Sequence, residues 1–230
     1  MSQKIKTPFF VINPKNFLYG KNLLTLAVKA NSLAQKYGVD TFFTSPPTEL
    51  INIVKKCPNL KVTAQHMDEN TLGNTMGRIL AEPLAECGVQ AVVLNHAEHQ
   101  LTISKLKESI HQAKEFKLKT IVCADSIKEA QMVAMLEPDI VLAEPSELIG
   151  QPQTSSKNYV QSTIEAIQSI NPNILVEQGA GIRTENDVRE LLYLGADGVG
   201  VTSGIIKAQD PQMMMEKMIK EVAKFSKGGK

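Results

Sequence analysis

The sequence predicts an α/β protein, a single (β/α)8 barrel domain over residues 1–230, on three observations. Short apolar, β-branched segments of strand length recur along the chain, too apolar for half-exposed antiparallel strands. Segments with helical spacing of apolar residues lie between them, and this alternation is predicted eight times. Such repeats imply parallel strands with right-handed crossovers, and eight units in this length fit a closed barrel better than an open sheet.

The predicted strands come first in each unit. In chain order they are PFFVIN (8–13), VDTFFT (39–44), LKVTAQ (60–65), QAVVLN (90–95), LKTIVC (118–123), DIVLA (139–143), NILVEQ (173–178) and DGVGVT (197–202). The clearest helical segments are 21–38, 101–116, 126–138 and 185–195. Asp125 or Ser126 can cap the third of these helices, and Thr184 with Asp187 fits a capping box before the fourth. Gly38 stands where the first should end.

Composition excludes several classes of protein. Hydrophobic residues make up 43% and charged residues 21%, as in globular proteins. The net charge is +1, aromatic residues make up 5% and Trp is absent, so no nucleic-acid partner is expected. No apolar run is long enough to span a bilayer and the start lacks a signal-peptide core, so we expect no membrane partner and a cytoplasmic location.

Residues at the carboxyl ends of the strands, and in the loops after them, build the active site of such a barrel. Those positions carry Asn13, Lys15, Gln65, His66, Asn95, His96, Glu98, Glu144, the run Gly179, Ala180, Gly181 and the run Thr202, Ser203, Gly204. The last two runs suggest an anion site, because glycines let backbone N–H groups approach phosphate oxygens. Plain turn chemistry is the alternative for either run taken alone.

Two histidines stand close together in NHAEH. A metal site at His96 and His99 needs a third ligand of matching chemistry, and none is evident, so we predict no metal and expect His99 at the surface. His96 falls at a strand end, where a helix beginning there would depress its pKa and favour a neutral, donating imidazole. The alternative is a core histidine bonded to its own backbone.

A lysine and a glutamate complete the pattern. Lys15 can neutralise a phosphate or a developing oxyanion, although a solvated loop lysine is the common case. Glu144 follows an apolar strand, and apolar walls would raise its pKa toward that of a general base. Glu147 competes for this role from the loop.

At this point the chain resembles the triosephosphate isomerases, particularly their short archaeal form, over nearly its whole length. The segments that carry the resemblance, in order, are VINPKNF, AQHMDENTLGNTMGR, LNHAEH, AEPSELIG, EQGAGIRTENDV and GVGVTSG. The resemblance implies an aldose–ketose isomerase of glycolysis and gluconeogenesis that interconverts dihydroxyacetone phosphate and D-glyceraldehyde 3-phosphate through an enediol(ate). It implies no cofactor and no metal.

The resemblance also assigns residues. It makes Glu144 the base, His96 the electrophile, Lys15 the electrostatic clamp, and Asn13 and Glu98 supporting groups. Together with the glycine runs it gives a phosphate site of Gly150, Gly179, Ala180, Gly181, Thr202 and Ser203. It further implies a homo-oligomer, a dimer or a tetramer, in which Thr75 reaches toward the neighbouring subunit.

The chain departs from the family pattern in three places. Ala97 replaces a serine beside His96, Gln151 and Pro152 replace the usual lid hinge, and a tyrosine common before the base is absent. An altered lid is where substrate length would be distinguished, so a related isomerase acting on a tetrulose phosphate is one alternative. A phosphate-ligand-binding homologue with low turnover is another, since fold does not fix function.

Overall fold

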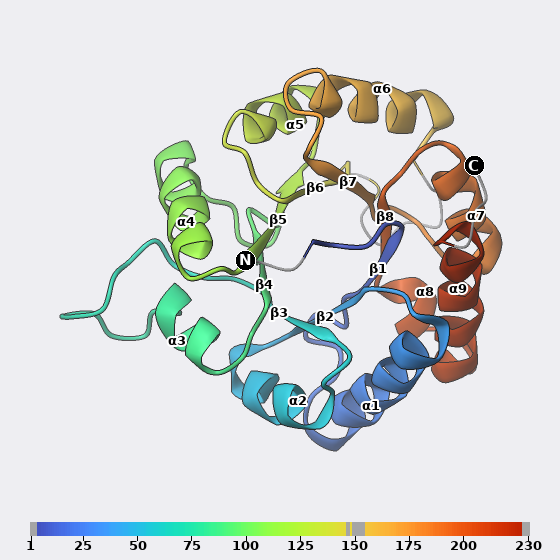
Figure 1. The fold of residues 1–230 in the computed structure, drawn as a ribbon, viewed down its shortest axis with the longest axis horizontal. Coiled ribbons are helices and arrows are strands. Elements are labelled where there is room, and N and C mark those ends of the chain that lie inside the picture. The colour runs from blue at the N-terminus through green and yellow to red at the C-terminus, as the bar shows by residue number, and fades with distance from the viewer. Residues whose placement is uncertain (1–3, 146–147, 149–154, 227–230) are drawn as a thin grey trace.

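The computed structural model describes residues 4–145, 148 and 155–226, and within them eight parallel strands form one closed barrel. Strands are hydrogen-bonded in sequence order, β8 pairs with β1, and the helices surround the sheet (Figure 1). The predicted (β/α)8 fold is confirmed. The strands are β1 (Phe9–Ile12), β2 (Thr41–Ser45), β3 (Lys61–Ala64), β4 (Ala91–Leu94), β5 (Lys119–Ala124), β6 (Ile140–Ala143), β7 (Leu175–Gln178) and β8 (Gly198–Val201).

The helices alternate with the strands as predicted. They are α1 (Gly20–Tyr37), the short 3-10 helix η1 (Pro47–Glu49), α2 (Leu50–Lys56), α3 (Ala81–Glu86), α4 (Ile103–Glu115), α5 (Ile127–Ala134), α6 (Lys157–Gln168), α7 (Glu185–Tyr193), α8 (Ser203–Ile206) and α9 (Pro211–Ser226). The part of the chain that the structure describes contains no helix long and apolar enough to cross a membrane.

The strands read as continuous apolar runs because both of their faces are buried. Along β1, Phe9 and Val11 belong to a compact cluster of residues from the strands, which fills the barrel. Phe10 and Ile12 belong to a larger cluster shared with helix residues such as Leu23. Because side chains alternate along a strand, one apolar sequence supplies both the interior and the layer beneath the helices.

Helix ends follow the predicted chemistry. Ser126, rather than Asp125, is the N-cap of α5, and its side chain accepts a hydrogen bond from the Glu129 N–H. Thr184 and Asp187 form the expected capping box at α7. Gly38 ends α1 with φ 69°, a left-handed conformation that glycine adopts without a Cβ penalty.

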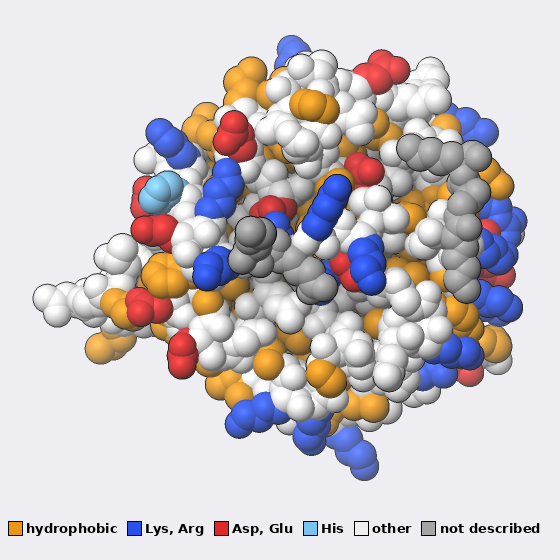
Figure 2. All heavy atoms as spheres, in the orientation of Figure 1, with side chains coloured by type: hydrophobic (Ala, Val, Ile, Leu, Met, Phe, Trp, Pro, Cys, Tyr) orange, Lys and Arg blue, Asp and Glu red, His pale blue; other side chains and the backbone are white. Residues whose placement is uncertain are grey.

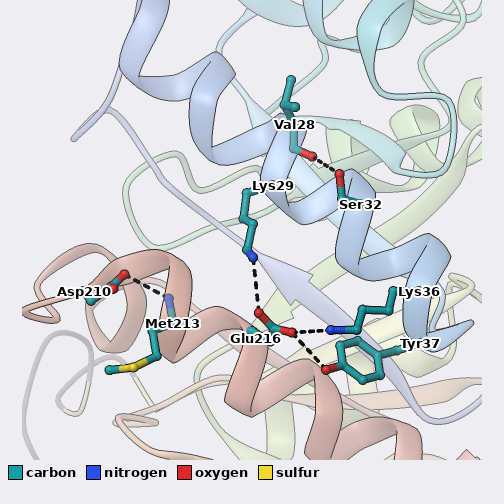
Figure 3. Close-up of polar contacts among 8 residues, drawn as sticks. All are labelled: Val28, Lys29, Ser32, Lys36, Tyr37, Asp210, Met213 and Glu216. Carbon is teal, nitrogen blue, oxygen red and sulfur yellow. Dashed lines mark hydrogen bonds and ion pairs between the residues drawn. The ribbon is translucent and has the colours of Figure 1, made fainter.

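The first and last long helices are joined by a polar cluster on Glu216 of α9 (Figure 3). Its carboxylate accepts from Lys29 Nζ at 3.2 Å, Lys36 Nζ at 2.7 Å and Tyr37 Oη at 3.0 Å, all three on α1. These donors lower the pKa of Glu216 to about 2. The cluster links the two ends of the chain where the barrel closes.

The segment between β3 and α3 projects away from the barrel (Figure 1). Its base is held by Asp68, whose carboxylate accepts from Arg78 Nη1 and from the Ile79 N–H, both at 2.8 Å. The projection carries exposed apolar side chains, with Leu72 57% and Met76 96% exposed. On the face drawn in Figure 2, positive and negative side chains are interspersed.

Candidate active site

The strand-end residues meet around a cavity of about 530 Å³. Eight of the predicted site residues line it: Asn13, Lys15, Glu98, Glu144, Gly179, Gly181, Thr202 and Ser203. A second cavity of about 310 Å³ shares Asn13, Lys15 and Glu98 with the first and adds His96. His96 and Glu144 also line one small pocket together. Residues from loops far apart in the sequence therefore line cavities that share several of their lining residues.

Lys15 is held in a strained backbone conformation. Its φ is 47°, which is uncommon for a residue with a side chain, and such strain persists only where neighbours hold it. The Lys15 N–H donates to Asn13 Oδ1 at 3.0 Å, and Gln65 Nε2 donates to the Lys15 carbonyl at 3.0 Å. Thr44 Oγ1 donates to the same Asn13 oxygen at 2.6 Å. Asn13 therefore orients the turn that directs Lys15 into the cavity.

His96 lies in a turn, and its protonation state follows from its contacts. The Glu98 N–H donates to Nδ1 of His96 at 3.1 Å, so Nδ1 is an acceptor and the ring proton is on Nε2. Among the described residues, Nε2 is buried without a hydrogen-bond partner. Burial, and secondarily the charge of Lys15, lower the pKa of His96. The imidazole is thus neutral with an available N–H donor.

The expected helix directly after His96 is not present. α4 begins at Ile103, capped by Thr102, so a hydrogen-bonded turn and not a helix N-terminus orients the imidazole. The preceding residue, Asn95, has φ 57°. Asn95 donates to the Cys123 carbonyl and to Glu129 Oε1, and accepts from the Leu101 N–H, at 3.0 to 3.1 Å. These bonds hold the bend that brings His96 to the barrel mouth.

Glu144 comes directly after β6, and its backbone N–H donates to the Ala124 carbonyl at 2.9 Å. Burial raises the pKa of the Glu144 carboxyl, and the charge of Lys15 lowers it by a smaller amount. The carboxyl lies over Gly179, where a Cβ would be 3.2 Å from Glu144 Oε1. A carboxylate with a raised pKa beside an ammonium group suits proton transfer near neutral pH.

The loops after β7 and β8 approach each other closely. A Cβ on Gly204 would lie 2.3 Å from the Ile182 carbonyl oxygen, so only glycine permits this contact. Gly181 has φ 70°, and it lines the cavity together with Gly179, Thr202 and Ser203. Ala180 is buried, at 3% exposure, and is not among the lining residues. Gly150, Gln151, Pro152 and Glu147 lie outside the described residues.

The remaining predictions concern His99, Thr75 and Ala97, all of which are exposed. His99 is at the surface as expected, and its ring stacks on that of His66, with centroids 3.7 Å apart. Thr75 lies in the projecting segment after β3, away from this chain's own cavity lining. Within the described ranges, no group of three or more His, Cys, Asp or Glu side chains is placed to hold a metal ion.

One lining residue, Glu177, was not singled out from the sequence. It belongs to β7, is 1% exposed, and lines the cavity together with Gly200 of β8. Burial, and secondarily the charge of Glu144, raise the pKa of Glu177 well above its ordinary value. The available signal was a carboxyl in the apolar run NILVEQ, two positions from Gly179 and hence on the same face of the strand.

Comparison with known proteins agrees with this geometry. The sequence model of the family described as Triosephosphate isomerase matches residues 8–222. A triosephosphate isomerase from Methanosarcina mazei is 33% identical over 221 residues, covering 94% of this chain and 99% of the relative. Those from Sulfolobus acidocaldarius and Methanocaldococcus jannaschii are 32% and 34% identical, over 96% and 94% of this chain and 97% and 98% of their own lengths.

Proposed function

The chain belongs to the triosephosphate isomerase family, and from this membership we propose that it interconverts dihydroxyacetone phosphate and D-glyceraldehyde 3-phosphate. Glycolysis and gluconeogenesis in the cytoplasm are where a member of this family would act. The observation that carries the proposal is a cavity that a lysine, a carboxyl of raised pKa and two glycine-containing loops line together. A neutral histidine lines a second cavity with the same lysine and a small pocket with the same carboxyl.

Glu144 is the base of the proposed reaction. Its carboxylate removes a proton from C1 of dihydroxyacetone phosphate, leaving an enediolate whose charge develops on the C2 oxygen. The proton is returned to C2, while the hydroxyl proton of O1 passes to O2 and C1 becomes the aldehyde. Burial of Glu144 supports this role because it brings the pKa of the carboxyl closer to the operating pH. Triosephosphate isomerases are known for a Glu base and a neutral His whose pKa values are adjusted by their surroundings.

His96 and Lys15 stabilise the oxyanion. The imidazole is held with Nε2–H available, because Nδ1 accepts from the Glu98 N–H. The ammonium of Lys15 acts on both His96 and Glu144, since its charge lowers the pKa of each. Donors fixed before the reaction stabilise the developing charge without reorganising. Asn13 and Glu98 support the two groups through the bonds described above.

The phosphate is assigned to the cradle formed by Gly179, Gly181, Thr202 and Ser203. Backbone N–H groups in glycine-containing loops and the hydroxyls of Thr202 and Ser203 supply donors for phosphate oxygens. Lys15 and Glu144 line the same cavity. A bound triose phosphate would thus extend from the cradle to the base.

The proposed function is tested by steady-state conversion of glyceraldehyde 3-phosphate to dihydroxyacetone phosphate, with erythrulose 4-phosphate as the competing substrate. We expect triose turnover that is lost in Glu144→Gln, which keeps the side-chain size but has no base. Turnover of the four-carbon sugar alone, or none with either sugar in a folded protein, would contradict the assignment.

We further propose a homo-oligomer, dimer or tetramer, built on the segment around Thr75. Exposed Leu72 and Met76 support it, because apolar side chains of this size on a projecting loop gain by being covered. Met76→Asp should shift the sedimentation coefficient toward the monomer. The same substitution at exposed Met213 is the matched control.

A further inference from the structure

The mechanism above makes no use of Glu177, a buried carboxyl inside the barrel. Leu175, Glu177 and Gly179 alternate along and just past β7 and share its inward face, where Leu175 packs against the interior cluster. Glu177 is 1% exposed and lines the same cavity as Glu144 and Lys15. A carboxyl is rarely buried in this way unless it is paired.

The neighbouring strand is shaped to hold this carboxyl. A Cβ on Gly200 of β8 would lie 2.2 Å from Glu177 Oε1 and 3.7 Å from Val11 Cβ. The carboxyl therefore occupies the space that an inward side chain at position 200 would fill. Glu177 and Gly200 are a matched pair, and packing fixes the position of the acid at the side of the cavity.

The carboxyl also has unused hydrogen-bonding capacity. Among the described residues, Glu177 Oε2 is buried with no hydrogen-bond partner. Leaving such a group unpaired is unfavourable, because nothing offsets the loss of its hydrogen bonds to water. The described part of the protein supplies no partner for this oxygen, and the residue that carries it lines a cavity that a ligand can enter.

The surroundings favour the protonated acid. Among the described residues, the titratable groups that line this cavity from other elements are Glu144 after β6, Lys15 after β1, Glu98 after β4 and Lys207 after α8. Cys123 of β5 belongs to the cluster that fills the barrel, where the charges of Glu144 and Glu177 help to raise its pKa. Burial, and secondarily the negative charge of Glu144, raise the pKa of Glu177 well above its ordinary value. A neutral carboxylic acid is a hydrogen-bond donor, and it does not repel a phosphorylated ligand.

We propose that Glu177 is a further ligand-binding residue of this pocket, which keeps its proton and donates a hydrogen bond to a carbon-borne oxygen of the phosphorylated sugar. The class of ligand rests on the proposed function. The donor selects ligands that carry a hydroxyl or carbonyl oxygen beyond the phosphate, since inorganic phosphate held in the cradle offers no such partner.

The test measures binding and not turnover, using glycerol 3-phosphate and inorganic phosphate as probes. Glu177→Leu should weaken glycerol 3-phosphate binding about 10-fold, the loss expected for one good hydrogen bond, and leave phosphate binding within about 2-fold. Glu177→Gln retains an N–H donor of similar size and should bind glycerol 3-phosphate within about 3-fold of the wild type. Glu86→Gln, on an exposed carboxyl of α3, is the matched control.

Infrared difference spectra give a second readout that needs only the wild type and Glu177→Gln. A protonated-carboxyl C=O band should be present at neutral pH, be absent from Glu177→Gln, and shift when glycerol 3-phosphate binds. An unchanged band in the variant, no shift with the ligand, or equal weakening of both probes in Glu177→Leu would overturn the proposal. A protein that binds glycerol 3-phosphate as expected yet turns over no triose would refute only the isomerase assignment and not the role of Glu177.

Discussion

Lys15 and Asn95 show how single residues prepare this site before a ligand arrives. Both have positive φ, 47° for Lys15 and 57° for Asn95. The Lys15 side chain lines the second cavity, and Asn95 directly precedes His96, which lines it too. Hydrogen bonds of side chains hold these conformations. The Asn13 and Gln65 side chains bond to the backbone of Lys15, and the Asn95 side chain bonds to the Cys123 carbonyl and to Glu129. At these two positions the backbone strain coincides with a group that lines a cavity, whereas Lys117 and Glu137, which also have positive φ, line none of these cavities.

Shortening the proposed base should affect rate more than binding. Glu144→Asp withdraws the carboxylate by one methylene and leaves the proposed phosphate loops unchanged. We expect kcat to fall at least about 100-fold with KM changed by less than about 3-fold, as for an interaction made only in the transition state. Steady-state kinetics check this. Equal losses in kcat and in binding would argue against Glu144 as the base.

The tautomer of His96 is measurable. Its pKa is lowered from the ordinary value of 6.5, so at pH 6.5 most molecules should hold a neutral ring. Nitrogen NMR of ¹⁵N-histidine-labelled protein, assigned with His96→Gln, should show the proton on Nε2, since Nδ1 accepts from the Glu98 N–H. An imidazolium at pH 6.5, or a proton on Nδ1, would contradict the electrophile described above.

Burying Glu177 should reduce stability at neutral pH. Its folded-state pKa is raised, so its contribution is complete below the unfolded value near 4.5 and is lost as pH rises toward the folded pKa. Over that range the wild type should lose up to about 1.4 kcal/mol per pH unit relative to Glu177→Gln, which does not ionise. Urea unfolding at several pH values measures the difference. A difference that stays constant above pH 4.5 would show that Glu177 titrates normally.

At the scale of elements, two glycines of β8 leave space for side chains of the strands on either side of it. Gly198 and Gly200 leave room for the Phe9 ring and the Glu177 carboxyl respectively. The same strand thus accommodates a large apolar group in the barrel interior and an acid at the cavity. The inward face of β8 thus leaves space both for packing of the barrel interior and for the carboxyl proposed to bind the ligand.

Adding one methyl group to β8 should lower the free energy of unfolding. In Gly198→Ala the Cβ would lie 2.3 Å from Phe9 Cε2, and overpacking of this kind costs about 1–3 kcal/mol. Urea unfolding of the wild type, Gly198→Ala, Phe9→Leu and the double variant forms a thermodynamic cycle. The penalty should be smaller in the Phe9→Leu background, where the ring is gone. An equal penalty in both backgrounds would show that the ring is not the obstacle.

At the scale of the whole molecule, closure of the barrel brings the two ends of the chain together. β1 pairs with β8, and α1 is bonded to α9 through Glu216 (Figure 3). These contacts join segments from the two ends of the sequence, and the pairing of β1 with β8 closes the barrel. The stability of the closed state therefore depends in part on this junction.

The Glu216 cluster should make closure sensitive to acid. The pKa of Glu216 is lowered from 4.5 to about 2, so its stabilisation is present above pH 4.5 and is lost as pH falls toward 2. The wild type should exceed Glu216→Gln in unfolding free energy by a constant amount above pH 4.5, and the difference should shrink below it. Denaturant melts from pH 7 to 2.5 check this. A difference that does not depend on pH would mean that the paired charge contributes nothing.

The sequence by itself determined the barrel and eight of the residues that line its site. Strand and helix periods are local patterns, and parallel strands direct their carboxyl ends to one mouth, so Lys15, Glu144 and the glycine runs could be brought together in advance. Only the tertiary structure decided the rest. The tautomer of His96 follows from a contact within its own folded turn. The packing of Glu177 against Gly200 and the stacking of His66 on His99 depend on atoms from separate elements. Such contacts are set by packing across the closed barrel, and no local period encodes them.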